Sequence, residues 1–276
     1  MAQSPVDTIS ALQHLITEDD TPVDNLPSEK QQRLLTEPLY SAWSGPGAGR
    51  MFLAAANVGI FAQPRNPAIV PDMFLSLDVQ VAEDWWRKEH RSYFVREFGK
   101  PPELVLEIVS NTEGNEDGEK KHKYAQMHVD YYVIYDPLQQ VMSDVLTVYR
   151  LRNGVYERQA TVQFPSLKLG LVLWEGTFED KHDTWLRWTD EHGVLIPTGK
   201  ERAEQERLRA AQERLRAEQA EDLVSQERQR AEHAVLRAAQ ERQRAEQAED
   251  LLSQERLRAE RLAALLRQAG VDPEQA

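Results

Sequence analysis

Apolar and polar positions divide the chain into two unlike parts. Nearly all aromatic and β-branched residues lie before about Gly199, and the sequence after that point consists mainly of Glu, Arg, Ala, Gln and Leu. A compositional change of this kind marks a domain boundary. We therefore expect a polar N-terminal segment at 1–25, a globular domain at 26–199, a charged helical tail at 200–268 and a disordered C-terminus at 269–276.

The pattern within the globular part predicts a mixed α/β sheet flanked by helices. A helix is expected from Leu26, with Ser28 as its N-cap. Apolar and β-branched runs predict strands, and Asn153–Gly154 is typical of the tip of a hairpin. The expected order is strands at 51–62, 68–82, 103–110 and 130–137, a helix at 119–128 between the last two, and the hairpin at 145–162. This order is not a regular βαβ alternation, so a mixed sheet is favoured.

The composition excludes several kinds of site. The chain has no cysteine, which excludes disulfides, zinc–thiolate sites and cysteine nucleophiles and suits a reducing interior. The sequence also lacks GxGxxG, GxxxxGK[ST] and GxSxG, the loops that hold phosphates or present a serine nucleophile. The first residues lack the basic and apolar regions of a secretory signal, and no apolar run is long enough to span a bilayer. We therefore expect a soluble, cytoplasmic protein without a membrane partner.

The charge is concentrated in the globular part. The formal net charge is −13, and residues 1–199 contribute −11 of it, with 18 basic and 29 acidic residues. Non-specific binding to DNA rests on the neutralisation of phosphates by Lys and Arg. The acidic domain therefore argues against strong, sequence-blind binding to nucleic acids.

Two carboxylates interrupt predicted strands that are otherwise apolar: Asp72 in 68–82 and Glu107 in 103–110. Burial of a lone carboxylate is costly unless the group is paired or binds a metal. Two carboxylates with hard oxygen ligands suit Mg²⁺ or Mn²⁺, which would neutralise charge on a phosphodiester and lower the pKa of an attacking water. Each acid also has a simpler explanation, because a Pro-Asp step is typical of a turn that enters a strand and Glu107 on an edge strand could face water.

A candidate cation lies on the helix that follows. Glu116, Lys120 and Tyr124 are spaced at i, i+4 and i+8, so they share one helix face. From that face Lys120 could orient a water or stabilise developing negative charge. Lys121 is an adjacent alternative, and Lys120 could equally be one more solvated lysine. Glu29 on the first helix is a weaker further acid.

The sequence around these positions resembles the PD-(D/E)xK nucleases. Pro71–Asp72 followed by Glu107–Ile108–Val109 looks like their motif. Over roughly 25–200, the blocks resemble the Uma-two family of bacterial restriction-endonuclease-like proteins and occur in the family's order: VPDMFLSLDVQV, DWWRKEHRSYFVREFGKPPELVLEIVSNTEG and VDYYVIYDP.

The resemblance implies a restriction-endonuclease-like fold and roles for three residues. Asp72 and Glu107 would ligate the metal, and Lys120 would assist catalysis. The motif's lysine should stand two residues after Glu107, where this chain has Val109. Lys120 on the following helix matches the family's displaced lysine instead.

The tail contains an internal repeat. Segments 210–232 and 238–260 are offset by 28 residues, which is four heptads, and differ at only three positions. The strong helix formers of this region predict one continuous helix from about 200 to 268, a rod of the order of 100 Å that protrudes from the domain. A mostly alanine seam recurs every seven residues and favours a coiled coil and a homo-oligomer. A single, solvated charged helix is the alternative.

These features together predict a Mg²⁺-dependent endonuclease that hydrolyses phosphodiester bonds, with DNA as substrate and Mn²⁺ as a possible substitute cation. The alternative is a catalytically inactive nuclease-fold scaffold or regulatory protein that acts through coiled-coil interactions. The acidic domain and Val109 keep this alternative open. Binding of Mg²⁺ or Mn²⁺ at millimolar concentration would distinguish the two.

Overall fold

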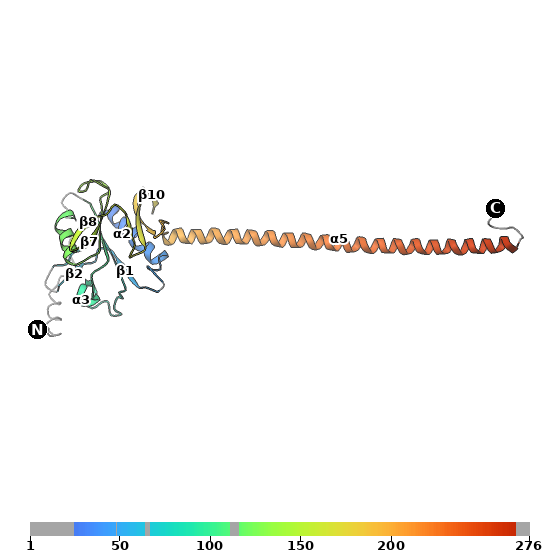
Figure 1. Ribbon diagram of the computed structural model, residues 1–276, viewed down its shortest axis with the longest axis horizontal. Coiled ribbons are helices and arrows are strands. Elements are labelled where there is room, and N and C mark those ends of the chain that lie inside the picture. Colours follow the sequence, from blue (N-terminus) through green and yellow to red (C-terminus); the bar gives the residue numbers. More distant parts are fainter. Residues whose placement is uncertain (1–24, 48, 64–66, 111–115, 269–276) are drawn as a thin grey trace. The chain divides into compact units, whose positions relative to one another are not determined.

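The structure is a computed structural model that describes residues 25–47, 49–63, 67–110 and 116–268, apart from the side chains of 116 and 117 (Figure 1). The chain divides into two compact units, Met1–Glu204 and Gln205–Ala276. Of the N-terminal segment predicted at 1–25, the structure describes Asn25. The segment predicted at 269–276 lies outside the described residues.

A six-stranded sheet forms the centre of the first unit. Its strand order is β1-β3-β5-β6-β7-β8, and β5 pairs with β6 in parallel while the other neighbours are antiparallel. The strands are β1 (Phe52–Ala55), β3 (Met73–Leu77), β5 (Leu104–Ile108), β6 (Tyr131–Tyr135), β7 (Leu146–Arg152) and β8 (Val155–Arg158). The predicted mixed α/β class is confirmed.

Two smaller sheets complete this unit. One contains β9 (Gln163–Phe164), β10 (Leu169–Phe178) and β11 (Lys181–Asp190), and the other pairs β2 (Ile60–Phe61) with β4 (Tyr93–Phe94). The apolar pattern alone does not predict the long β10–β11 hairpin. Many of its residues face solvent, and its turn places Glu179 and Asp180 at positive φ rather than using glycine.

Helices cover both faces of the central sheet. They are α2 (Leu26–Ala42), the helical turn η1 (Lys88–His90), α3 (Val95–Phe98), and the π-helical turn η2 (Glu116–Lys120) that continues into α4 (Lys121–Gln126). Leu104, Leu106 and Ile108 of β5 pack in a core with α2, β10 and β11. The alternate residues Val105 and Val109 pack in a second core with Tyr124 of α4. Strand β5 is therefore buried on both faces.

Several boundaries differ from the pattern-based expectation. Asn25, not Ser28, is the N-cap of α2, because its side-chain oxygen accepts from the backbone N–H of Ser28 at 2.9 Å. The strand expected at 51–62 is divided into β1 and β2, with Asn57 at φ 54° between them. Asp72 lies in a bend immediately before β3 rather than inside a strand. The hairpin predicted around Asn153–Gly154 is present, and both turn residues have positive φ, as such a turn requires.

The last described element is α5 (Gly199–Gln268), one continuous helix of 70 residues without a buried residue. Its start is fixed within the first unit. Thr198 caps it by accepting from the N–H of Glu201 at 3.2 Å, and Glu201 accepts from the buried Arg187 at 2.6 Å. Among the residues that the structure describes, no helix combines the length and apolarity needed to cross a bilayer.

Candidate metal centre

Asp72 is held at the entrance to β3 by contacts on both carboxylate oxygens. One oxygen accepts from the backbone N–H of Ile108 at 2.6 Å, and the other accepts from the carboxamide of Gln32 at 2.9 Å. The hydrogen bond from Ile108 follows directly after the last backbone pair of the antiparallel β3–β5 ladder, with the Asp72 carboxylate as the acceptor in place of a backbone carbonyl. The bend of Pro71–Asp72 therefore does more than start a strand, because it ties the carboxylate to the end of β5.

Glu107 lies within β5 and is 1% exposed. Its side chain points to the face of the sheet that α4 covers, where Lys120 Nζ donates to Oε2 at 2.8 Å and the hydroxyl of Tyr124 donates to Oε1 at 2.7 Å. An edge-strand glutamate that faces water is excluded by this burial. The helix spacing of Lys120 and Tyr124 explains why both side chains reach one carboxyl group.

The two acids converge at one end of the β3–β5 pair. Met73 stands opposite Leu106, so one further step of the same register places Asp72 opposite Glu107. Asp72 itself lies in the bend just outside this ladder, where it accepts from Gln32 of α2, whereas Glu107 accepts from Lys120 and Tyr124 on the side of α4. The negative charge of Asp72 is also among the influences that raise the pKa of Glu107.

The buried position changes the protonation of Glu107. Burial is the largest influence and raises the pKa of this carboxyl group to about 8, and Asp72 adds to the rise. The ammonium of Lys120 and the hydroxyl of Tyr124 act in the opposite direction without reversing it. Glu107 therefore holds its proton more tightly than an exposed glutamate does, and a bound cation would favour its ionised form.

The structure separates the two neighbouring lysines. Lys120 donates to Glu107, whereas Lys121 Nζ lies 3.6 Å from the centroid of the Tyr149 ring in a cation–π contact. Lys120 is thus the lysine brought to the two acids. Glu29 does not join them, because Arg33 Nε lies 2.6 Å from its carboxylate on the exposed side of α2.

Sequence reasoning missed the amide side chains beside Asp72. Gln32 on α2 donates to Asp72, and Asn57 Nδ2 donates to the oxygen of the Gln32 carboxamide at 3.0 Å. Asn57 thereby fixes which end of the Gln32 amide faces Asp72. No sequence motif marks Gln32 and Asn57. Helical spacing could have shown only that Gln32 lies on the buried face of α2.

The comparisons with known proteins identify the family of this chain. Residues 19–177 match the family model of Uma2, described as "Putative restriction endonuclease". The chain belongs to the Uma2 family. The match includes Asp72, Glu107 and Lys120 and ends within β10, so α5 lies outside it. No curated protein and no solved structure matches the chain.

Membership of the Uma2 family supports a nuclease-type function, and Val109 stands two residues after Glu107, where the sequence motif would have a lysine. Val109 is 2% exposed and packs in the same core as Tyr124. A lysine at this position would have to be buried among apolar side chains. The ammonium group near Glu107 instead comes from Lys120 at the junction of η2 and α4.

The Uma2 site fits a hard divalent cation. Mg²⁺ in proteins is commonly bound through one or two carboxylates, with waters and substrate phosphates completing its shell. Asp72 and Glu107 offer that donor set, and each ionised carboxylate has acceptor sites beyond its present contacts. No group of three or more His, Cys, Asp or Glu side chains suited to a metal occurs in the described part of the chain. A two-carboxylate site is therefore the arrangement to test.

Proposed function

We propose that this protein is a Mg²⁺-dependent endonuclease that hydrolyses phosphodiester bonds of DNA. The observation that carries the proposal is the convergence of Asp72 and Glu107 at the end of β3 and β5, with Lys120 donating to Glu107. Family membership supplies independent support for a nuclease. Mn²⁺ is expected to replace Mg²⁺, because both are hard cations that accept carboxylate oxygens.

Each residue has a distinct role in the proposed reaction. Asp72 and Glu107 would hold the cation, which when bound supplies charge neutralisation at the phosphate and a lowered pKa for the attacking water. Lys120 carries a positive charge beside Glu107 and would orient that water or stabilise charge on the phosphoryl oxygens. Tyr124 holds the Glu107 carboxyl group in place through its hydroxyl. Gln32 does the same for Asp72.

The charge of the domain sets an expectation for binding. With a net charge of −11 over residues 1–199, the domain offers few cations for phosphates. DNA binding should therefore depend on the divalent cation and should weaken only modestly with added monovalent salt, because few Lys or Arg contacts with phosphates are lost. This behaviour separates the proposal from a general nucleic-acid-binding role.

Cleavage assays test the proposal. The full chain should nick or linearise DNA in the presence of Mg²⁺ or Mn²⁺, and the activity should disappear with EDTA. Asp72→Asn and Glu107→Gln should each abolish it, whereas Glu175→Gln, which removes an exposed acid on β10, should not. Cleavage that survives in either of the first two variants would reject the assigned roles.

The second candidate is a nuclease fold without catalysis that acts as a scaffold. The buried Val109 favours it, because the strand itself carries no lysine. This candidate predicts that the chain neither cleaves DNA nor is stabilised by millimolar Mg²⁺. If millimolar Mg²⁺ stabilises the folded chain and this stabilisation is lost in Asp72→Asn, the scaffold candidate is excluded.

We further propose that α5 is the self-association element of this protein. Its apolar side chains are exposed, among them Leu208, Leu215, Leu236 and Leu257 at 56–61%. The 28-residue repeat preserves heptad phase, so one helix can meet a second copy in the same way at both repeats. The partner helix would cover these leucines and the alanine seam beside them.

A further inference from the structure

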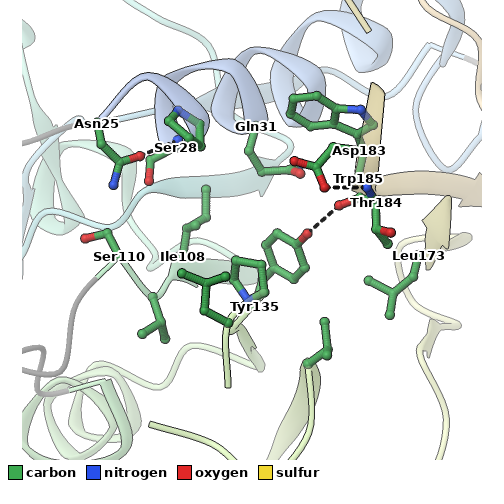
Figure 2. Close-up of a pocket in the computed structure, with 15 residues that line it drawn as sticks. Asn25, Ser28, Gln31, Ile108, Ser110, Tyr135, Leu173, Asp183, Thr184 and Trp185 are labelled. Atoms are coloured by element: carbon green, nitrogen blue, oxygen red, sulfur yellow. Dashed lines mark hydrogen bonds between the residues drawn. The ribbon is translucent and has the colours of Figure 1, made fainter. Parts of the chain in front are cut away.

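A pocket of about 410 Å³ opens at the ends of β5 and β6, between α2 and the β10–β11 hairpin (Figure 2). Its walls come from the N-terminal turns of α2, the ends of β5 and β6, and the β10–β11 hairpin. This volume is within the range of clefts that hold small ligands. Neither the motif nor the proposed metal centre uses it.

The pocket has a buried floor and an open rim. Ile108, Tyr135 and Trp185 are each at most 6% exposed and form the apolar and aromatic floor. The rim includes Leu138 and Leu173, which are 70% and 40% exposed. A ligand can therefore enter from solvent and find flat apolar surfaces inside.

The polar groups of the pocket lie at opposite ends. The side chains of Asn25 and Ser28 lie at the α2 end, and the carboxylate of Asp183 lies at the hairpin end (Figure 2). Asp183 Oδ1 accepts from the N–H of Thr184 at 2.7 Å, and the carboxylate keeps further acceptor capacity. Among the residues that the structure describes, no Lys or Arg lines the pocket. The pocket therefore does not suit a phosphate and does suit an uncharged ring with hydrogen-bonding edges.

The fixed hydroxyl of Tyr135 preserves this arrangement. It donates to the carbonyl oxygen of Thr184 at 2.8 Å, so the ring is held with one side toward the cavity. Burial and, to a smaller extent, the charge of Asp183 raise the pKa of Tyr135 to about 12. The hydroxyl thus stays protonated and keeps its contact across the working pH range.

The pocket and the metal centre share two walls. On α2, Gln31 lines the pocket while the next residue, Gln32, donates to Asp72. At the end of β5, Ile108 and the residue that follows the strand, Val109, line the pocket directly after Glu107. Successive residues of a strand point to opposite faces, so Ile108 faces the pocket while Glu107 faces α4, and the two sites meet at the end of β5.

We propose that this pocket binds one unstacked nucleobase of the nucleic acid whose phosphate lies at Asp72 and Glu107, and so contributes to sequence specificity. Enzymes that take a base out of a stack read it by hydrogen bonds to its edge and by contact with aromatic and apolar side chains. Tyr135, Trp185 and Ile108 supply the contact surfaces, and Asp183 and Asn25 supply an acceptor and a donor at opposite edges. The inference rests on the proposed nuclease function.

Matched variants on β10 test the pocket. Leu173→Trp should fill it, because Leu173 lines it, whereas Val172→Trp places the same side chain on the other face of the strand. The two positions are 40% and 36% exposed, so both should accept tryptophan without loss of the fold. Asp183→Asn replaces an acceptor by an amide that can also donate, with Asp180→Asn in the hairpin turn as its control.

The first measurement is independent of catalysis. The four deoxynucleosides are titrated into the metal-free full chain and followed by NMR or calorimetry. At least one should bind saturably at millimolar concentration, Leu173→Trp should weaken that binding by about tenfold or more, and Asp183→Asn should change the order of preference among the bases. The controls should behave as the unchanged protein.

The second measurement is Mg²⁺-dependent cleavage of DNA of varied sequence. Leu173→Trp should reduce cleavage and alter its sequence preference, while Val172→Trp should not. The pocket proposal is wrong if no nucleoside binds and if Leu173→Trp binds and cleaves DNA like the unchanged protein. The proposed nuclease function would stand in that case. If nucleosides bind in the pocket but no DNA is cleaved, the pocket holds a base and the proposed catalysis fails.

Discussion

At the scale of single residues, the burial of Glu107 has the largest consequence. A carboxyl group whose pKa rises from 4.5 to about 8 on folding binds more protons in the folded than in the unfolded state between these values. Its contribution to stability is therefore fully present below pH 4.5 and is lost as pH rises through 8. This is opposite to the usual behaviour of a paired carboxylate.

The first prediction follows from this decrease in stability with rising pH. For the metal-free chain, the free energy of unfolding should fall by a few kcal/mol between about pH 5 and pH 9 through Glu107. Urea unfolding at a series of pH values measures it. Glu107→Gln should flatten the profile, and Glu175→Gln should leave it unchanged. A free energy of unfolding that does not change with pH in the unchanged protein would contradict the raised pKa of Glu107.

The second prediction separates the two lysines. Lys120→Met should lower metal-dependent cleavage by about 100-fold, because it removes the only lysine that donates to Glu107 in the described part of the chain. Lys121→Met removes a cation–π contact with Tyr149 and should cost about 1 kcal/mol of stability or less with little loss of rate. Single-turnover rates and melting curves for both variants give the comparison. Equal losses of rate would refute the assignment.

The sequence predicted part of this residue-level arrangement. Asp72 and Glu107 stand out because they interrupt apolar runs, and Lys120 follows from helical spacing. Gln32 and Asn57 could not be predicted, because their contacts depend on how α2 packs over the entrance to β3. The choice between Lys120 and Lys121 also needed the structure, since the two are one position apart on a short helix.

At the scale of secondary-structure elements, a partly buried ion pair contributes to holding the first turn of α5. Arg187 on β11 is 1% exposed and donates to both Glu201 carboxylate oxygens, at 2.8 and 2.6 Å, and to the carbonyl oxygen of Ile196. The same guanidinium group lies over the ring of Trp174. The first turn of α5 is therefore fixed by the hairpin that the apolar pattern failed to predict.

The third prediction concerns this pair. Glu201→Gln leaves the Arg187 charge buried without its counter-ion and should destabilise the first unit by about 1–3 kcal/mol, with the lower part of the range favoured because Glu201 is partly exposed. Chemical denaturation of the full chain measures the loss. Glu213→Gln, an exposed position on the same helix, should change nothing. An unaltered unfolding midpoint in Glu201→Gln would show that the pair is not structural.

Element boundaries show where the sequence pattern was insufficient. Apolar runs predicted where strands occur but not where they break, because Asn57 and the Pro71–Asp72 bend interrupt runs that read as continuous. The β7–β8 hairpin was predictable because Asn-Gly demands a particular turn. The β10–β11 hairpin was not, since its turn uses non-glycine residues at positive φ and the half of its length nearest the turn is mostly exposed.

At the scale of the whole molecule, the sequence predicted the change from a globular unit to a long helix. The composition shift near Gly199 coincides with the first residue of α5, and the absence of Gly and Pro from 200–268 explains the continuity of the helix. The composition of α5 does not identify the surface that packs against it.

The fourth prediction concerns self-association through α5. Sedimentation of the full chain at tens of micromolar should show an oligomer, and a chain that ends after Glu204 should sediment as a monomer. The truncation keeps Glu201, so the Arg187 pair and the compact unit Met1–Glu204 are preserved. A monomeric full chain would leave a solitary charged helix as the better description.

The most direct test of the metal centre is the binding of Mn²⁺ to the full chain, followed by electron paramagnetic resonance without any nucleic acid. The paired acids predict a saturable site whose affinity increases with pH up to about 8, because Glu107 must lose its proton to ligate the ion. Binding should be lost in Asp72→Asn and in Glu107→Gln and kept in Glu175→Gln. Absence of a saturable site, or a site that survives both substitutions, would contradict the proposed centre.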